Sequence, residues 1–245
     1  MLSFLKSKPV LKDLIPDNHI DIHSHLLPAI DDGAQSIDDT SFLLKSLSDL
    51  GIKNCITTPH VMNTIYPNTS EKINTILAAT ISELTAKQIE TPLKAAAEYF
   101  MDDSFLEQLK SEKLLTLKDN YVLVEMSYMN PPINLYDIIF EIQVAGYKPV
   151  LAHPERYFFY HKSFSDYQKL RNSGCLFQLN LLATVGYYGL DAAKTTDLLL
   201  KKGMYDLVGS DVHHKKHIEA FSNKLIIKEI ASLKEAISGN QLFTF

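Results

Sequence analysis

Several features that define whole classes of protein are missing from this sequence. It has no long uncharged apolar stretch, which excludes a helix that spans a membrane. Its only cysteines, Cys55 and Cys175, are too few for a disulfide framework, and neither begins the Cys-x5-Arg loop of a cysteine-dependent phosphatase. Residues 1–12 lack the apolar core and the cleavage site of a signal peptide, so we expect a cytoplasmic protein.

Clusters of Lys and Arg are missing as well. The net charge of the 245-residue chain is -5, and a surface that follows nucleic-acid phosphates needs concentrated positive charge, so we expect no nucleic-acid partner. Hydrophobic residues make up 46% and charged residues 22%, as is typical of a globular protein. No change in composition divides the chain, and its length suits one barrel domain, so we expect residues 1–245 to form a single domain.

Short apolar runs alternate with amphipathic segments along the chain. We predict seven buried strands, at residues 19–22, 52–57, 93–97, 121–124, 149–152, 176–181 and 206–208. We predict helices between most of them, at residues 36–50, 71–90, 104–112, 133–145, 167–172 and 192–202. This alternation indicates parallel strands joined by helical crossovers, in an α/β fold.

Nine side chains that can bind metals punctuate the chain at the ends of apolar runs. They are His23, His25, Asp32, His60, Glu98, Glu125, His153, Asp211 and His213. These candidates follow six of the seven predicted strands, whereas an open sheet would gather its ligands at one switch point. A ring of parallel strands brings all such ends together. We therefore predict a distorted TIM-like (β/α)7 barrel with a metal site at the C-terminal ends of its strands.

Two clusters place metal-competent side chains two residues apart. Residues at this spacing on an extended chain point to the same side, so His23 and His25 can bind one cation, and Asp211 and His213 can do the same. The alternative for the first pair is two polar residues on a strand that faces solvent. The acidic turn that follows favours metal binding, and Asp31 in this turn is a candidate partner for a ligating histidine.

Two further histidines and two glutamates follow apolar runs singly. His60 and His153 each stand beside a proline that restricts the backbone, although a loop histidine can also be merely exposed. Glu98 and Glu125 end strongly apolar runs, where an unpaired charge is costly to bury. Either a cation or an ion pair with Arg or Lys would explain each glutamate.

Taken together, these motifs resemble those of the polymerase and histidinol phosphatase superfamily. The motifs are His23-x-His25, Asp31-Asp32-Gly33, Thr58-Pro59-His60, Glu98, Glu125, His153-Pro154-Glu155-Arg156 and Ser210-Asp211-x-His213. Residues 27–33 are similar to a signature of the bacterial manganese-dependent tyrosine-protein phosphatases encoded with capsule and exopolysaccharide genes. The resemblance covers nearly the whole chain.

This resemblance implies three divalent metal ions. Nitrogen and oxygen ligands with a large share of carboxylates favour Mn2+, with iron or zinc as alternatives. The implied ligand sets share Glu98 between two ions and are, in order, His23, His25, Glu98 and Asp211; Glu98, Glu125 and His153; and Asp32, His60 and His213.

By the same resemblance, the activity is the hydrolysis of phosphotyrosine in proteins. We expect a metal-bridging hydroxide near Glu98 as the nucleophile, and we expect the planar guanidinium of Arg156 to bind the phosphate. The alternative for Arg156 is a salt bridge to Glu155 or Glu125. Eight aromatic side chains near the expected mouth either form a wall for the phosphotyrosine ring or pack elsewhere; they are Tyr66, Tyr99, Phe100, Tyr128, Tyr157, Phe158, Tyr187 and Tyr188.

One position departs from the family pattern. Family members often carry an arginine shortly after the final Asp-x-His, so Lys215, Lys216 or His217 would have to replace it here. We expect the other histidines, His214 among them, to lie at the surface or behind the ligands.

The implied substrate is the phosphotyrosine tail of a membrane tyrosine autokinase. Two alternatives remain open. A small-molecule phosphatase of the histidinol-phosphatase type would use the same metals. A noncatalytic partner of the capsule machinery would use the metals only for stability.

Overall fold

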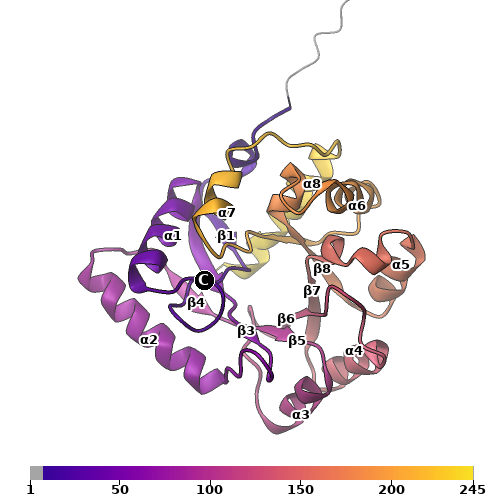
Figure 1. Cartoon of the computed structure of the whole chain (residues 1–245), viewed down its shortest axis with the longest axis horizontal. Helices are drawn as coiled ribbons and strands as arrows, with labels where there is room; N and C mark the ends of the chain where they lie inside the picture. Colours follow the sequence, from indigo (N-terminus) through magenta and orange to yellow (C-terminus); the bar gives the residue numbers. More distant parts are fainter. Residues whose placement is uncertain (1–7, 245) are drawn as a thin grey trace, which may run out of the picture.

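Parallel strands form the centre of the molecule. The computed structural model describes residues 8–244, in which two sheets lie inside a surrounding layer of helices (Figure 1). One sheet has the order β1-β2-β4 and the other has the order β3-β5-β6-β7-β8-β9. The strands are β1 (His19–Asp21), β2 (Ile52–Thr57), β3 (His60–Val61), β4 (Leu93–Ala95), β5 (Glu98–Phe100), β6 (Tyr121–Glu125), β7 (Lys148–Ala152), β8 (Leu176–Asn180) and β9 (Leu207–Gly209).

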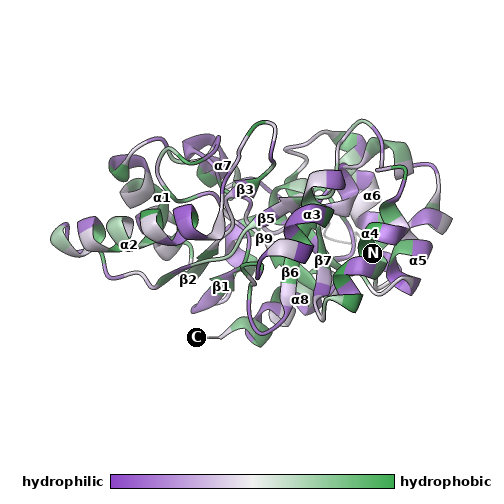
Figure 2. Ribbon diagram, turned by 90° about the horizontal axis from the view of Figure 1, so that it is seen from below, coloured by the Kyte–Doolittle hydropathy of each residue, from purple (hydrophilic) through white to green (hydrophobic). Residues whose placement is uncertain are grey.

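Helices alternate with the strands along the chain. The α-helices are α1 (Ile37–Asp49), α2 (Ser70–Ala86), α3 (Asp103–Ser111), α4 (Leu135–Val144), α5 (Phe164–Asn172), α6 (Leu190–Lys201), α7 (Lys215–Ala220) and α8 (Ile230–Gly239). Each of the six predicted helices overlaps one of α1 to α6, whereas α7 and α8 have no counterpart in the prediction. Figure 2 shows hydrophobic and hydrophilic residues alternating along these helices. None of the described helices is both long enough and apolar enough to cross a bilayer.

The two sheets replace the predicted barrel. A closed TIM-like barrel of seven strands is not found in residues 8–244, although the α/β class and the parallel pairing are confirmed. The predicted strands at residues 52–57 and 93–97 continue, after short breaks, as β3 and β5, which belong to the other sheet. Pro59 lies in the first break and has no amide hydrogen to donate to a neighbouring strand.

Both sheets nevertheless share one inner core. Side chains from β1 and β2 in one sheet and from β6, β7 and β9 in the other form a single buried cluster, which includes Ile20, Ile56, Leu123, Val150 and Leu207. The residues on either side of Leu123 belong to the outer core, as the two-residue period of a strand requires. An isolated parallel bridge also pairs the segments that follow β1 and β9. These contacts hold the C-terminal ends of the strands close to one another.

His19 gives the fold a specific sensitivity to acid. The imidazole is fully buried at the start of β1, neither ring nitrogen has a hydrogen-bond partner, and burial lowers its pKa to about 4. Because this value lies below the unfolded value of about 6.5, the neutral ring contributes stability above pH 6.5 that is lost as the pH falls toward 4.

A His19→Leu variant tests this sensitivity to acid. Between pH 7 and pH 4, we predict that its free energy of unfolding falls by about 3 kcal/mol less than that of wild type. Urea denaturation at both pH values measures this difference, and equal losses would contradict it.

Candidate metal centre

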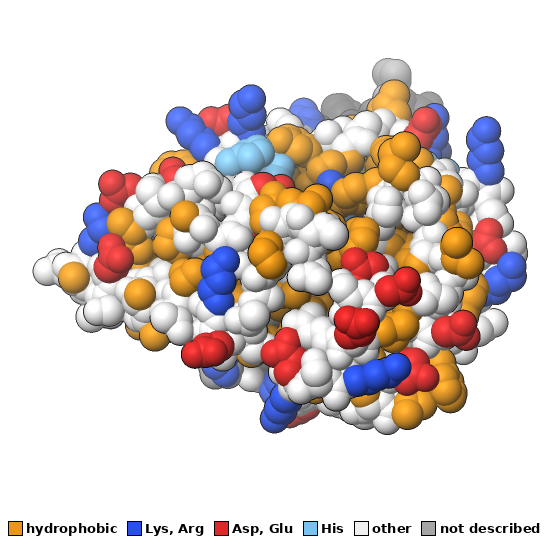
Figure 3. Space-filling view, turned by 60° about the horizontal axis from the view of Figure 1, so that its bottom comes forward, with side chains coloured by type: hydrophobic (Ala, Val, Ile, Leu, Met, Phe, Trp, Pro, Cys, Tyr) orange, Lys and Arg blue, Asp and Glu red, His pale blue; other side chains and the backbone are white. Residues whose placement is uncertain are grey.

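All nine predicted ligands come together, from the segments that follow β1, β7 and β9, from the starts of β3 and β5, and from the end of β6. They fall into four overlapping groups, and within each group the potential ligand atoms lie within 4.8 Å of one another. The groups are His25, Asp32, His60 and His213; His23, Glu98 and His153; His23, His25 and Asp211; and His60, Glu98 and Glu125. Figure 3 shows histidine side chains next to acidic and hydrophobic ones on one face of the molecule.

Two buried histidine nitrogens lie at ligand-to-ligand distance from each other and from two buried carboxylate oxygens. The Nε2 atoms of His23 and His25 lie 3.4 Å apart. His23 Nε2 lies 3.2 Å from Asp211 Oδ1 and 3.3 Å from Glu98 Oε2, and His25 Nε2 lies 3.4 and 3.5 Å from the same two oxygens. Two atoms that each lie about 2.1 Å from one tetrahedral or octahedral metal ion are about 3.0–3.4 Å apart. These four side chains are the first ligand set implied by the resemblance.

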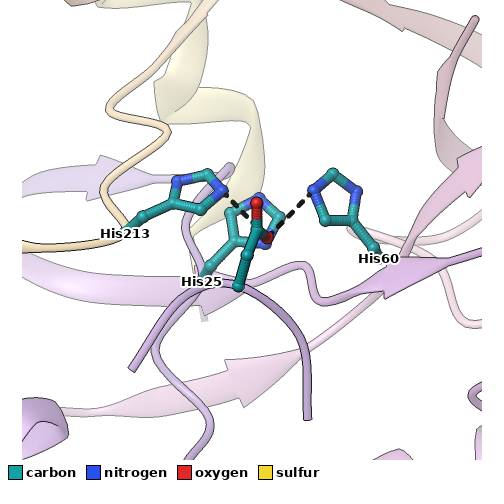
Figure 4. Close-up of side chains that lie close together, drawn as sticks. His25, His60 and His213 are labelled. Atoms are coloured by element: carbon teal, nitrogen blue, oxygen red, sulfur yellow. Dashed lines mark ion pairs between the residues drawn. The ribbon is translucent and has the colours of Figure 1, made fainter. Parts of the chain in front are cut away.

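A second group surrounds Asp32 (Figure 4). Asp32 Oδ1 lies 3.5 Å from Nε2 of His60 and 3.5 Å from Nε2 of His213. The ring of His25 lies beside them and stacks on that of His213, with a centroid separation of 3.9 Å. This group contains the third implied set and adds His25 to it.

The remaining implied set is arranged differently from the expectation. Glu98 faces His153 Nε2 with Oε1, at 3.2 Å, and His60 Nδ1 with Oε2, at 3.1 Å. Glu125 Oε1 lies 2.9 Å from the same His60 nitrogen. Glu125 is therefore grouped with His60, and His153 is grouped with His23, rather than with each other. His60 lies between two groups and faces a carboxylate with each of its nitrogens.

The charges in this cluster strongly influence one another. Burial favours neutral imidazoles, but nearby carboxylates outweigh it, raising the pKa of His23 and His25 well above the usual range and that of His60 to about 10. Burial likewise opposes the charge of Glu98 and Asp211, yet the histidines hold both pKa values well below the usual range. Glu98 Oε2 is buried and lies 3.1 Å from His60 Nδ1 and 3.3 Å from His23 Nε2, but neither contact has hydrogen-bond geometry. Divalent cations would satisfy this oxygen and would replace the imidazole protons, so the residues fit a metal cluster.

A surrounding layer of polar side chains orients the histidines. Gln178 Oε1 accepts a hydrogen bond from His23 Nδ1 at 2.7 Å, and Asp31 Oδ2 accepts one from His25 Nδ1 at 2.8 Å. Both bonds leave Nε2 as the nitrogen that faces the cluster, which is the usual arrangement behind a ligating histidine. Asp31 thus makes the contact that its place in the acidic turn suggested.

The backbone around the cluster has little freedom. A Cβ atom on Gly33 would lie 2.3 Å from His25 O, so only glycine lets the acidic turn pack against this histidine. His153 and Asp211 both have positive φ, 35° and 50°. Such values are uncommon for residues other than glycine and tend to occur at functional sites.

Arg156 lies beside the cluster and is held from three sides. Its Nη1 donates a hydrogen bond to Asp211 Oδ2 at 2.8 Å, and Asn180 Nδ2 donates to the same oxygen at 2.8 Å. The guanidinium carbon lies 4.6 Å from the ring centroid of Tyr128 and 4.2 Å from that of Tyr188. Cation–π contacts and a charge-assisted hydrogen bond therefore fix its position.

Arg156 makes neither of the two alternative salt bridges considered from the sequence. Glu155 is fully buried on the other side of the loop, where Oε1 accepts a hydrogen bond from Asn180 N at 2.9 Å and Oε2 accepts one from the hydroxyl of Tyr205 at 2.9 Å. Burial raises the pKa of Glu155 to about 7. Glu155 thus anchors the loop that carries Arg156.

The cluster opens into a cavity of about 740 Å³. Seven of the nine candidate ligands line it, while His23 and His25 lie buried beneath. Half of the predicted aromatic wall lines it as well, namely Tyr66, Phe100, Tyr128 and Tyr188. The other four aromatic residues are not in its lining; they are Tyr99, Tyr157, Phe158 and Tyr187.

Two further histidines belong to the cavity wall: we expected His214 at the surface or behind the ligands, and His217 was one of three candidates to replace the family arginine. His214 and His217 both line the cavity, whereas Lys215 and Lys216 do not. His217 Nδ1 accepts a hydrogen bond from His213 N at 3.1 Å, and burial lowers the pKa of His217 to about 3, so its ring is neutral. The four-residue spacing between His213 and His217 across the start of α7 is the sequence signal that could have placed it.

Comparison with known proteins now identifies the family. The family described as "Capsular polysaccharide synthesis, CpsB/CapC" matches residues 19–224. The chain belongs to the CpsB/CapC family. The match spans the cluster from His23 to His213, so all of the metal-competent side chains lie within the shared region.

Named members of this family cover most of the chain. Tyrosine-protein phosphatase YwqE of Bacillus subtilis (strain 168) is 28% identical over 198 residues, which cover 80% of this chain and 78% of that protein. Tyrosine-protein phosphatase CpsB of Streptococcus pneumoniae is 27% identical over 203 residues, which cover 80% and 83%. One solved chain also matches, with a TM-score of 0.77 at 26% identity over 88% of this chain and 86% of that chain. It comes from the crystal structures of YwqE from Bacillus subtilis and CpsB from Streptococcus pneumoniae, described as unique metal-dependent tyrosine phosphatases.

Asp31→Asn tests the layer behind the histidines. The variant weakens the acceptor that holds His25 Nδ1, so we expect the affinity for Mn2+ to fall about 10- to 100-fold. Calorimetric titration of the metal-stripped protein measures this change. Asp38→Asn, at a position whose side chain is 83% exposed, is the matched control and should bind Mn2+ as wild type does. An unchanged affinity in Asp31→Asn would show that the Asp31 carboxylate does not support a ligating histidine.

Proposed function

We propose that this chain is a metal-dependent protein-tyrosine phosphatase. The observation that carries the proposal is the convergence of nine imidazole and carboxylate side chains at a cavity that also contains Arg156 and four aromatic rings. Relatives named as tyrosine-protein phosphatases, one of them described structurally as metal-dependent, support it. The metals are proposed to be three divalent ions, most simply Mn2+, held by the ligands His23, His25, Asp32, His60, Glu98, Glu125, His153, Asp211 and His213.

Metal ions at this cluster would supply positive charge to the phosphate oxygens and activate water as the nucleophile. The protein's own contribution is to hold the substrate and the reacting groups in one productive arrangement. Buried carboxylates such as Glu98 and Asp211 would hold the cations, and the hydrogen bonds behind His23 and His25 orient these two histidines.

Arg156 is proposed to bind the phosphate. Asp211 and two tyrosine rings fix the guanidinium, and one hydrogen bond to Asp211 leaves further N–H groups of the planar fork for a phosphate oxygen. His217, neutral and at the cavity wall, is the remaining candidate for the missing family arginine, because Lys215 and Lys216 do not line the cavity.

The cavity also suits the leaving group. Tyr66 stacks on His60 with ring planes 13° apart, and Phe100 also lines the cavity, so aromatic surface lies beside the candidate ligands. A phenolate has a pKa of about 10, far below that of an alkoxide, so tyrosine departs with little help from a general acid. An aromatic phosphate ester thus fits both the walls and the chemistry.

Other classes of phosphatase fit less well. Both cysteines are buried, and burial raises the pKa of Cys55 well above its usual range and that of Cys175 to about 12, so neither is a reactive thiolate. A small-molecule phosphatase of the histidinol-phosphatase type remains the alternative because it requires the same metals.

The proposed substrate is the phosphotyrosine tail of a membrane tyrosine autokinase that controls capsule or exopolysaccharide synthesis. Membership in a family described by capsular polysaccharide synthesis supports this choice. A cytoplasmic location belongs to the same proposal, because the phosphorylated tail of such a kinase would lie there.

Metal dependence and substrate class are tested together. We expect metal-stripped protein to hydrolyse a tyrosine-phosphorylated peptide only after Mn2+ is added, and His153→Ala to lose at least about 100-fold in kcat/KM because a ligand is removed. Histidinol phosphate is the parallel substrate. Turnover of histidinol phosphate alone would move the assignment to a small-molecule phosphatase. No turnover with any metal would favour the noncatalytic interpretation.

Arg156→Lys tests the phosphate-binding role. Lysine keeps the charge but lacks the planar fork that stacks on the tyrosine rings, so we expect kcat/KM for the phosphopeptide to fall about 10- to 100-fold while Mn2+ affinity is retained. Arg171→Lys is the matched control, because the other arginine of the chain pairs with Asp206 outside the cavity. Equal activities of the two variants would remove Arg156 from the site.

A further inference from the structure

Large hydrophobic side chains are exposed at the rim of the cavity. Ile65 and Met129 line its mouth and are 62% and 83% exposed, and Ile133, four residues beyond Met129, is fully exposed. Exposed apolar groups that gather beside a binding site indicate a surface that a partner covers. The phosphate ester itself needs only the interior of the cavity, so these side chains are available for a larger substrate.

The cavity continues into a neighbouring groove. This groove, of about 270 Å³, lies between the start of α3 and the segment at residues 127–134. Phe100 and Ser127 line both the cavity and the groove, so the two adjoin. One residue of an extended chain spans about 3.3–3.6 Å, so a residue adjacent to a bound phosphotyrosine reaches the groove.

The groove is preformed. Asn134 Nδ2 donates a hydrogen bond to Asp103 Oδ1 at 3.1 Å and so joins its two walls. Pro131 and Pro132 restrict the backbone of one wall, and Met129 N donates to Ser127 Oγ at 3.1 Å. When the walls of a site are already fixed, binding a side chain does not cost the entropy of ordering those walls.

The charge of the groove excludes one class of side chain. Its lining combines the apolar Met101, Pro132 and Ile133 with the carboxylates of Asp102 and Asp103. The described lining contains no Lys, Arg or His. An acidic side chain would therefore meet like charge, whereas an apolar one would cover Ile133.

We infer that this groove binds the residue next to phosphotyrosine in a polypeptide substrate, and that it favours a hydrophobic side chain over an acidic one. The inference rests on the proposed phosphatase function and makes it more specific, because the groove gives the enzyme a reason to prefer peptides over small phosphate esters. Ile133 is the main specificity residue, and Asp103 is the residue that disfavours acidic neighbours.

The test compares two phosphopeptides and one small ester on the Mn2+-loaded enzyme. The peptides differ only in carrying Leu or Glu on both sides of phosphotyrosine, and phenyl phosphate reports the chemistry without the groove. Wild type should prefer the Leu peptide. Ile133→Ser should lower kcat/KM for the Leu peptide roughly tenfold through lost apolar contact and leave phenyl phosphate unchanged. Asp103→Asn should improve the Glu peptide selectively.

Val144→Ser is the matched control, because Val144 is 64% exposed on α4 but lines neither the cavity nor the groove. It should leave all three substrates unchanged. The inference about the groove is overturned if wild type hydrolyses both peptides equally, or if Ile133→Ser has the same activities as Val144→Ser. In either case, turnover of phenyl phosphate would still support the phosphatase function. Failure of wild type to hydrolyse any of the three substrates overturns both.

Discussion

The buried carboxylate of Glu98 is the constraint on which the site depends. It is fully buried and lies within 3.5 Å of imidazole nitrogens from His23, His25, His60 and His153. A carboxylate buried alone would cost several kcal/mol, so positive charge must accompany it, as imidazole protons or as metal cations. These histidines come from three segments of the chain: His23 and His25 follow β1, His60 begins β3, and His153 follows β7. The inner core shared by both sheets holds these segments together.

The same balance of charge connects the cluster to the cavity. Asp211 directs Oδ1 toward His23 and His25 and uses Oδ2 to hold Arg156 and Asn180. One carboxylate therefore positions both the ligands of a metal and the candidate phosphate-binding side chain. Its left-handed backbone conformation is a local strain that the surrounding contacts maintain.

Sequence reasoning found the convergent side chains better than the connections between strands. The apolar runs, the strand-end positions of Glu125 and His153, and the helices from α1 to α6 all follow from local periodicity. The prediction of a closed barrel failed because the closure of a sheet depends on which distant strands pair, and local periodicity carries no information about that pairing. The positions of His217 and of the aromatic residues depend on how loops pack after the strands end, and the grouping of His60 with Glu125 depends on side-chain rotamers.

Anomalous diffraction from crystals grown with Mn2+ tests the central claim most directly, because it locates metal independently of activity. The account predicts a manganese peak among His23, His25, Glu98 and Asp211, where each histidine nitrogen already lies 3.2–3.5 Å from the other and from the two carboxylate oxygens. It predicts further peaks beside Asp32 and beside His153. If crystals of active protein grown with Mn2+ gave no anomalous peak within ligand distance of Glu98, protons alone would balance the buried carboxylate. That result would contradict the metal centre.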